Sequence, residues 1–178
     1  MLKILLILFL STTTIYAENK NFIKLITDCS DKVQNNYADN QKIPLELLLA
    51  QAIIESNWGK SRFAIEGNNY FGIRTWDDNV PQLKPLKRPD ATFGLQVYKD
   101  ACESVKHYID TLNTSNQYKS LRKIRKLELK LWGKVDPEVL AMGLINYSEE
   151  KDLYISKVKE KIRTVSYTHL TLPTTPYV

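Results

Sequence analysis

The chain has 178 residues, 43% of them hydrophobic and 25% charged, a balance that excludes a disordered chain and fits one globular domain. With 25 Lys and Arg against 20 Asp and Glu it carries a net charge of +5 at pH 7, which favours an acidic polymer as partner. Both ends differ in composition from the rest, so we expect the folded domain to span residues 18–164.

Residues 1–17 have the layout of a secretory signal peptide. Lys3 precedes the apolar run from Ile4 to Leu10, and Ser-Thr-rich sequence then ends at Ala17, the expected cleavage position. The apolar run is shorter than the roughly 20 residues that span a bilayer, so a permanent anchor is the weaker alternative. We therefore expect an exported protein with no stable membrane span after cleavage, and no nucleic acid as partner.

Residues 165–178, VSYTHLTLPTTPYV, contain no Asp, Glu, Lys or Arg, although a charged helical segment precedes them directly. Back-translation of VSYTHL can reproduce the end sequence of a transposon that is used to prepare sequencing libraries. We interpret this segment as a non-native tail from adapter read-through. A genuine proline-bearing extension is the alternative.

Helical periodicity dominates the chain between these ends. Apolar residues at spacings of three and four predict a first helix over 19–37. Pro44 begins a second helix that ends near Asn57, and Gly59 is its natural stop. Because this helix is apolar on nearly all sides, we expect it at the centre of the domain. The other predicted helices are 100–112, 116–132, 136–146 and one that begins at Ser148, whose apolar stripe is Leu153, Ile155, Val158 and Ile162.

Two short strands are expected between the second and third helices. Residues 70–74 form one candidate, and the β-prone segment 91–98 forms the other. Residues 77–89 hold three prolines and no helical period, so we expect a loop or an irregular hairpin there. The predicted fold class is mainly α, or α+β, with one small β element.

The chain has two cysteines, Cys29 and Cys102, which both fall on apolar faces of predicted helices. Two buried free thiols are the simpler interpretation. Because an exported protein reaches an oxidising compartment, one disulfide is the alternative. His107 is the only histidine in residues 18–164, so we expect neither a histidine-based metal site nor a cofactor.

Glu55 is the first candidate for catalysis, because it continues an apolar face into the last turn of the second helix. A low dielectric and the negative end of the helix dipole both raise the pKa of a carboxyl group. A glutamic acid that stays protonated near neutral pH can protonate the oxygen that leaves when a glycosidic bond breaks. A solvated surface charge is the alternative.

Side chains suited to binding sugars follow Glu55 closely. Aromatic faces can stack on pyranose rings, and asparagine amides can bond hydroxyl and acetamido groups. The candidates are Trp58, Asn68, Asn69, Tyr70, Phe71 and Trp76. Core filling is the alternative for the aromatic residues, but it does not account for the asparagines between them.

Four motifs occur in order between residues 44 and 162: LAQAIIESNWGKS, NNYFGI, VYKDACESVKHYIDTLNT and NYSEEKDLYISKVKEKI. This series resembles the glucosaminidase family of peptidoglycan hydrolases, whose domain is of the mannosyl-glycoprotein endo-beta-N-acetylglucosaminidase type, and most closely its Bax-like branch in Gram-negative bacteria. The resemblance implies a lysozyme-like helical domain with a small β lobe. It also implies an endo-β-N-acetylglucosaminidase that acts on peptidoglycan glycan strands in the periplasm or cell envelope.

The resemblance implies roles for individual residues as well. Glu55, in the E-x-x-W-G pattern, would be the general acid, and Tyr147, in NYSEE, would lie in the cleft beside the reacting sugar. Asn69, Phe71 and Gly72 match the N-x-F-G segment that shapes the cleft floor.

A second carboxylate that would position or activate water is not placed by the motifs. Asp90, just before the second strand, is the first candidate, and Asp77 and Asp78 come next. Each could instead be an ordinary loop charge. The 2-acetamido group of the substrate serves as nucleophile in some glycosidases, so a missing carboxylate does not forbid catalysis.

Two other functions stay open. A lytic transglycosylase also needs one glutamic acid but gives anhydro-muramic products, and a non-catalytic wall-binding protein could keep the fold and the cleft.

The predicted helix over 116–132 is strongly basic, which is usual for a solvated face but would also suit acidic stem peptides or phosphate-bearing wall polymers. Its basic residues are Lys119, Arg122, Lys123, Arg125, Lys126 and Lys130. The sequence gives no signal of an oligomeric state.

Overall fold

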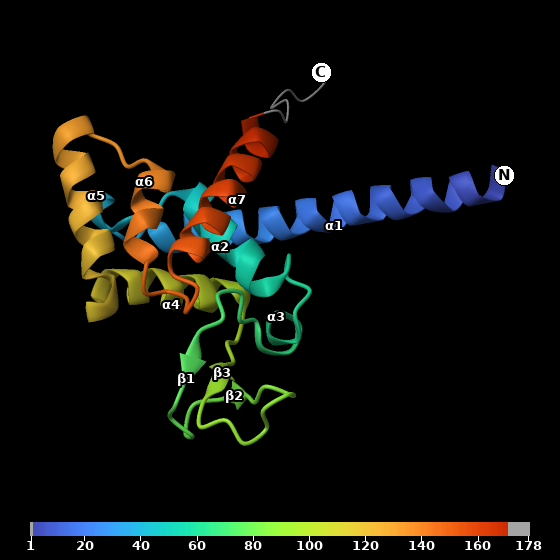
Figure 1. The fold of residues 1–178 in the computed structure, drawn as a ribbon, viewed down its shortest axis with the longest axis horizontal. Coiled ribbons are helices and arrows are strands. Elements are labelled where there is room, and N and C mark those ends of the chain that lie inside the picture. The colour runs from blue at the N-terminus through green and yellow to red at the C-terminus, as the bar shows by residue number, and fades with distance from the viewer. Residues whose placement is uncertain (1, 171–178) are drawn as a thin grey trace.

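The structure is a computed structural model that describes residues 2–170, with side chains over 17–167. It confirms a mainly helical fold with a small β lobe: helices gather into one body, and a small sheet extends from it (Figure 1). The helices are α1 (Leu2–Gln34), α2 (Leu45–Ser56), α3 (Arg62–Gly67), α4 (Ala101–Thr114), α5 (Lys119–Trp132), α6 (Pro137–Ala141) and α7 (Asp152–Leu170). Short 3-10 turns cover Asp39–Gln41, Asn116–Tyr118 and Met142–Leu144.

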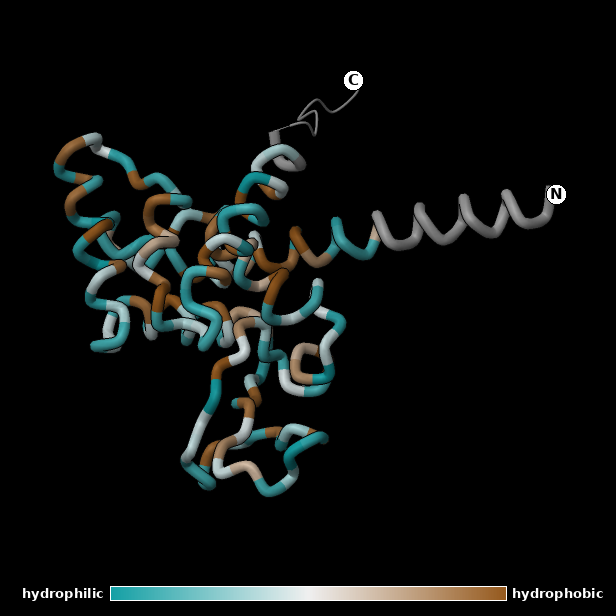
Figure 2. Tube along the Cα trace, in the orientation of Figure 1, coloured by the Kyte–Doolittle hydropathy of each residue, from teal (hydrophilic) through white to brown (hydrophobic). Residues whose placement is uncertain are grey.

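Helix α2 lies at the centre of the helical body, as its all-round apolar sequence predicts. Leu47, Leu48, Leu49 and Ala50 are completely buried, and α2 packs against α1, α6 and α7. Figure 2 shows hydrophobic segments gathered around this centre and hydrophilic ones on the outer turns. Burial on all sides explains why no polar stripe occurs in this helix before its last turn.

The C-terminal end of α2 turns sharply through three left-handed residues. Asn57 is the C-cap with φ 50°, and Trp58 and Gly59 follow at φ 59° and 73°. Gly59 is required twice over, because its positive φ suits glycine and a Cβ there would stand 2.8 Å from the ring of Phe22. The turn therefore seats the end of α2 directly against α1.

Helix α1 is longer than predicted and runs from Leu2 instead of residue 19. No glycine or proline interrupts residues 2–18, so the backbone can continue as one helix through the expected leader. Among the described helices, none is long and apolar enough to cross a membrane. The division into leader and domain stays a prediction.

Helix α7 also differs from its prediction. It begins at Asp152 rather than at Ser148 and continues to Leu170, six residues into the segment interpreted as a non-native tail. Val165, the first residue of that segment, is buried in the body. Residues 171–178 of the segment lie outside the described residues.

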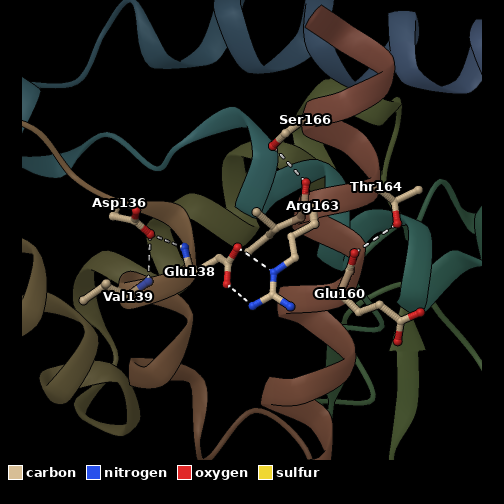
Figure 3. A network of polar contacts seen from close by, with 8 residues as sticks. Asp136, Glu138, Val139, Glu160, Arg163, Thr164 and Ser166 are labelled. Carbon is tan, nitrogen blue, oxygen red and sulfur yellow. Dashed lines mark hydrogen bonds and ion pairs between the residues drawn. The ribbon is translucent and has the colours of Figure 1, made fainter.

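The predicted helix over 136–146 is shorter, since α6 ends at Ala141 and a 3-10 turn follows. Its predicted N-terminus is confirmed: the carboxylate of Asp136 accepts hydrogen bonds from the backbone N–H groups of Glu138 and Val139. Glu138 also binds Arg163 through both carboxylate oxygens, at 2.9 and 2.6 Å (Figure 3). This exposed pair ties the start of α6 to α7.

The preference for two free thiols is wrong, because Cys29 of α1 and Cys102 of α4 form a disulfide. The two helices pack along each other and bring the two Cα atoms to 4.7 Å, a separation that a disulfide bridges readily. Sequence spacing of 73 residues gave no information on that approach.

The β lobe is a three-stranded antiparallel sheet in the order β1-β3-β2. Its strands are β1 (Arg74–Thr75), β2 (Gln82–Leu83) and β3 (Gly94–Gln96), with Arg74 opposite Leu95 and Gln82 opposite Gln96. β2 lies inside the segment 77–89, which is predicted to be a loop or an irregular hairpin, and it pairs antiparallel with β3. A two-residue strand bounded by prolines has no periodic pattern, and its pairing with β3 supplies the hydrogen bonds that define it.

The basic residues of α5 separate into two groups. Lys119, Lys123, Lys126 and Lys130 are exposed, as expected for a solvated face. Arg125 is instead 3% exposed and donates hydrogen bonds to the carbonyl oxygen of Gln41 and to Asn113. Arg122 donates to the carbonyl oxygens of Leu112 and Ser115 at the end of α4. These two arginines join helices and do not belong to the outer face.

Candidate active site

A cleft of about 920 Å³ opens where the β lobe meets the helical body. Four parts of the chain line it: the end of α2, the segment 71–76 with Arg88 from the β lobe, one face of α4 with residues 117 and 118, and the loop 145–151 before α7. The cleft therefore collects residues that are far apart in the sequence. Its volume is at the upper end of the range for pockets that bind small molecules, so several sugar units can enter it.

Glu55 projects from the last turn of α2 into this cleft. Its Oε1 accepts a hydrogen bond of 2.7 Å from the hydroxyl of Tyr154 on α7. That hydroxyl accepts in turn from Nε2 of Gln51 at 2.9 Å, and Tyr108 donates to the amide oxygen of Gln51. One carboxylate oxygen is thus held by a buried polar chain, which fixes the direction in which the other oxygen points.

Burial raises the pKa of Glu55 above its ordinary value. The hydrogen bond from Tyr154 and the nearby charge of Arg74 act in the opposite direction, and the charge of Glu150 adds to the rise. Burial is the dominant cause, because it penalises the ionised form of a carboxyl group that the protein cannot fully solvate. The group is therefore disposed to carry a proton into the cleft.

Gly72 brings the backbone of the β lobe close to Glu55. It has φ +64°, and a Cβ there would lie 3.1 Å from the carboxylate oxygen Oε2. A side chain at this position would be strained and would crowd the oxygen that Tyr154 leaves unbonded. Glycine thus keeps the reactive side of Glu55 open.

Tyr147 joins the site from the loop before α7. Its hydroxyl donates a 2.7 Å hydrogen bond to the carbonyl oxygen of Phe71, and its ring stacks on Tyr154 with centroids 5.5 Å apart. Phe71 is completely buried and stacks on Tyr108 at 4.1 Å. Tyr147 therefore connects the segment beside Glu55 to the loop on the opposite wall.

The structure brings together five of the ten predicted site residues. They are Glu55, Phe71, Gly72, Trp76 and Tyr147, and all of them line the cleft. Trp76 is 65% exposed on the β-lobe wall, where a sugar ring can reach its face.

Four predicted sugar-binding residues lie elsewhere, so their geometry does not support that interpretation. Trp58 and Tyr70 pack against Phe22 of α1, with ring centroids 6.1 and 6.0 Å from it. Asn69 is buried and bonds the backbone of Ile73 through both its amide atoms. Asn68 is the C-cap of α3 and donates to the carbonyl oxygen of Tyr98. The aromatic residues are core filling, and the asparagines hold the β lobe to the body.

No aspartate predicted as the second carboxylate lines the cleft. Asp90, Asp77 and Asp78 are all exposed on loops of the β lobe. The carboxylates that do line it, besides Glu55, are Glu149 and Glu150 from the NYSEE motif. Glu150 pairs with Lys157 at 2.7 Å, and its charge acts on Glu55.

Tyr154, Gln51 and Tyr108 were missed from the sequence. The apolar stripe predicted for the last helix correctly included Val158 and Ile162, which are buried, but it also included Leu153, which is 57% exposed, and omitted Tyr154, which is buried. Tyr154, Val158, Ile162 and Val165 recur at spacings of four, four and three, and all four are buried. This spacing was the signal available in the sequence. Its last residue, Val165, was not considered because we interpreted the segment after Thr164 as a non-native tail.

Within the described residues, no group of three or more His, Cys, Asp and Glu side chains is placed to hold a metal ion. His107 lines the cleft, and its Nδ1 shares a 2.8 Å hydrogen bond with the hydroxyl of Tyr98. Burial lowers the pKa of His107, so its neutral form is favoured.

Comparison with known proteins adds a family and a fold. The family model described as mannosyl-glycoprotein endo-beta-N-acetylglucosaminidase matches residues 31–166. The protein Bax of Escherichia coli (strain K12) is 33% identical over 104 residues, which cover 58% of this chain and 35% of that protein. The chain thus matches only about a third of the length of this relative.

Two solved structures share the fold. The glycoside hydrolase domain of FlgJ from Salmonella typhimurium superposes with a TM-score of 0.60 at 20% identity, over 85% of this chain and 90% of that domain. The catalytic domain of the autolysin Auto from Listeria monocytogenes gives a TM-score of 0.61 at 19% identity, over 85% and 86% of the two chains. At such low identity the likeness establishes the fold alone.

Proposed function

The chain belongs to the glucosaminidase family, and on that premise we propose that it is an endo-β-N-acetylglucosaminidase that hydrolyses β-1,4 bonds in peptidoglycan. One observation carries the proposal. Glu55 reaches into a cleft of about 920 Å³ at the end of a buried helix, with its pKa raised by burial and its orientation held by Tyr154. A protonated carboxyl group in a sugar-sized cleft is the requirement for general-acid cleavage of a glycosidic bond.

In the proposed mechanism Glu55 donates its proton to the glycosidic oxygen as the bond to the sugar breaks. Tyr154 holds one carboxylate oxygen, so the proton is carried by the oxygen that faces the cleft beside Gly72. Trp76 offers an exposed ring to a sugar on the β-lobe wall. Once the proton is transferred, the same hydrogen bond from Tyr154 and the charge of Arg74 stabilise the carboxylate.

The partner that activates water is a separate part of the proposal. Glu149 and Glu150 lie in the cleft and replace Asp90 as the first protein candidates, and the acetamido group of the substrate is the alternative. Single Glu149→Gln and Glu150→Gln variants distinguish these choices. A loss of activity in one variant assigns the role to that carboxylate, and full activity in both favours the acetamido group.

We also propose that the chain is exported, with residues 1–17 as the leader, and that it works in the periplasm or cell envelope. The presence of a disulfide between Cys29 and Cys102 supports an oxidising compartment. Mass spectrometry of the N-terminus of the purified protein tests the leader, since cleavage would leave Glu18 first.

Product analysis of purified peptidoglycan after digestion tests the proposed function. We expect new reducing ends on N-acetylglucosamine, identified by reduction with borohydride and mass spectrometry. Products that end in 1,6-anhydromuramic acid would instead identify a lytic transglycosylase. Binding to peptidoglycan without any product would identify a wall-binding protein.

Replacing Tyr154 with Phe is expected to move the alkaline limb of the pH profile of kcat to higher pH. The Tyr154 hydroxyl favours the ionised form of Glu55, so its loss raises the pKa of Glu55 further. Because a general acid works only while protonated, activity then persists to higher pH. The profile is measured on purified peptidoglycan.

If Glu150→Gln stays active, so that Glu150 does not activate the water, it is the control of opposite sign. Its charge raises the pKa of Glu55, so its removal should move the same limb to lower pH. If the limb stays in place in both variants, Glu55 is not the group whose ionisation limits the reaction.

A further inference from the structure

Two arginines of the β lobe, one from strand β1 and one from a loop, converge on the same aromatic ring beside the cleft. The guanidinium carbon of Arg74 lies 4.5 Å from the centroid of the Phe93 ring, and that of Arg88 lies 5.7 Å from it. Both arginines line the cleft, and so does Trp76, whose ring lies 6.0 Å from Phe93. One wall of the cleft is therefore aromatic and positively charged.

The sheet explains why these side chains meet. Side chains alternate along extended chain, so Arg74 of β1 and Trp76, which directly follows β1, lie on the same side, while Thr75 between them is buried. Arg74 pairs with Leu95 of β3, which places it diagonally opposite Phe93. Arg88 reaches the ring from the turn that begins at Pro85, whose carbonyl oxygen accepts from the Arg88 backbone N–H.

Neither guanidinium has a carboxylate partner within 4 Å among the described residues. Of the other arginines, Arg62 pairs with Glu66 at 2.9 Å and Arg163 with Glu138 at 2.6 Å, whereas Arg122 and Arg125 bond carbonyl and amide oxygens. A guanidinium that lies over a ring contacts it through its flat face and keeps its N–H edges available as donors. Two neighbouring positive charges repel each other, so the arrangement is stabilised when an anion lies between their edges.

The opposite wall has a different charge. It carries Glu149 and Glu150, together with Lys151, on the loop before α7. Because Glu150 is paired with Lys157 and Lys151 lies beside it, that wall has little net positive charge, and a carboxylate entering the cleft is attracted mainly by the two arginines on the other side. The cleft thus orients an anionic substrate group toward the β lobe.

We propose that Arg74 and Arg88 bind a carboxylate carried by the muramic acid residue of the substrate, so that the cleft prefers muramic-acid-containing strands over uncharged glycans. This inference rests on the proposed function and names the substrate class of the same site. The carboxylate can come from two sources: the stem peptide, or the lactyl group itself where the peptide has been removed. Arginine suits either source, because its planar fork matches a carboxylate with two parallel hydrogen bonds.

The site also couples binding to catalysis. The charge of Arg74 lowers the pKa of Glu55, against the effect of burial. A carboxylate bound to Arg74 offsets that charge and favours the protonated, active form of the acid. A substrate with the anionic group therefore helps to prepare the proton that its own cleavage needs.

Ligand binding tests the proposal without turnover when two full-length proteins are compared: Glu55→Gln alone, and Glu55→Gln combined with Arg88→Gln. Three soluble ligands are compared by calorimetry: peptide-bearing muramic-acid tetrasaccharides, the same strands after amidase treatment, and N-acetylglucosamine oligomers without a carboxylate. For at least one muramic ligand we expect Arg88→Gln to raise the Kd on the order of fivefold, the scale of one charge-assisted contact in a solvent-exposed site. The Kd for the uncharged oligomers should stay within about twofold, because no carboxylate is lost there.

The dependence on ligand identifies the source of the carboxylate. A change with the peptide-bearing ligand assigns the stem peptide, since its lactyl group is blocked as an amide, and a change only after amidase treatment assigns the lactyl group. Arg88→Lys, which keeps the charge but loses the planar fork, should recover part of the affinity.

Lys87→Gln is the matched control, because Lys87 is exposed beside Arg88 and does not line the cleft. If Lys87→Gln loses as much affinity for the muramic ligands as Arg88→Gln, the effect comes from net charge alone, and the proposal is overturned. It would also fall if Arg88→Gln changed no muramic ligand, or changed all three ligands alike. If none of the three binds and product analysis finds no new ends, the proposed function itself fails, which is a different result.

Discussion

Replacing Glu55 with Gln is expected to lower kcat on purified peptidoglycan by about a thousandfold, within the range that general-acid catalysis contributes. The amide keeps the shape of the side chain and can still accept the hydrogen bond from Tyr154, but it has no proton to give to the leaving oxygen. Binding of the glycan should persist, because the walls of the cleft are unchanged. The measurement is kcat from reducing-end release, together with a pull-down on insoluble peptidoglycan.

The same variant is expected to be more stable than the wild type at neutral pH. A carboxyl group whose pKa is raised in the folded state ionises more readily in the unfolded state, so its contribution to stability falls as pH rises above the unfolded pKa. Glutamine does not ionise, so the variant does not lose stability in this way as pH rises. The Tm of Glu55→Gln should therefore exceed that of the wild type at pH 7 but approach it in acid.

Glu46→Gln is the matched control, since it removes the same charge from the first turn of the same helix, far from the cleft. It should leave kcat unchanged. Clearing of peptidoglycan by Glu55→Gln at the wild-type rate would remove Glu55 from the role of acid. A lower Tm with lost activity would point to misfolding instead.

Removing the disulfide with Cys29→Ser and Cys102→Ser is expected to lower the free energy of unfolding by about 4 kcal/mol, the value for a closed loop of this length. The bridge spans 73 residues of sequence and joins α1 to α4. Its loss frees the unfolded chain from a large constraint, and it leaves two hydroxyl groups in an apolar contact. Denaturant unfolding, followed by far-UV circular dichroism, measures the change.

The wild type with and without a reductant provides the control for this prediction. Reduction should shift the midpoint of the wild type toward lower denaturant and leave that of the double serine variant unchanged. If the reductant has no effect on the wild type, the two cysteines are not bridged in solution.

The disulfide also bears on the active site through α1. Phe22 of α1 contacts Trp58 and Gly59, which belong to the turn that ends α2. Glu55 lies one residue before the end of that helix. We therefore expect the double serine variant to lose activity at a lower temperature than the wild type, as α1 detaches from the end of α2.

The buried carboxyl group of Glu55 and the fold class were accessible from the sequence because their signals are local. An all-round apolar helix must be buried, so the carboxylate in its last turn meets a low dielectric whatever the rest of the fold is. The motifs around Glu55 and Tyr147 then identified the family, which the match over residues 31–166 confirmed. Helical periods located most helices within a few residues.

The rest of the site was decided by the tertiary structure, because its residues are distant in sequence and each looks ordinary in its own segment. Tyr154 bonds Glu55 across 99 residues, and Tyr147 reaches Phe71 across 76. Asn68 and Asn69 resembled sugar ligands in the sequence, yet their side-chain amides donate hydrogen bonds to the backbone carbonyl oxygens of Tyr98 and Ile73. Periodicity determines which face of a helix is buried, whereas the side chains that meet in a cleft depend on how separate elements pack, and only the folded chain establishes that.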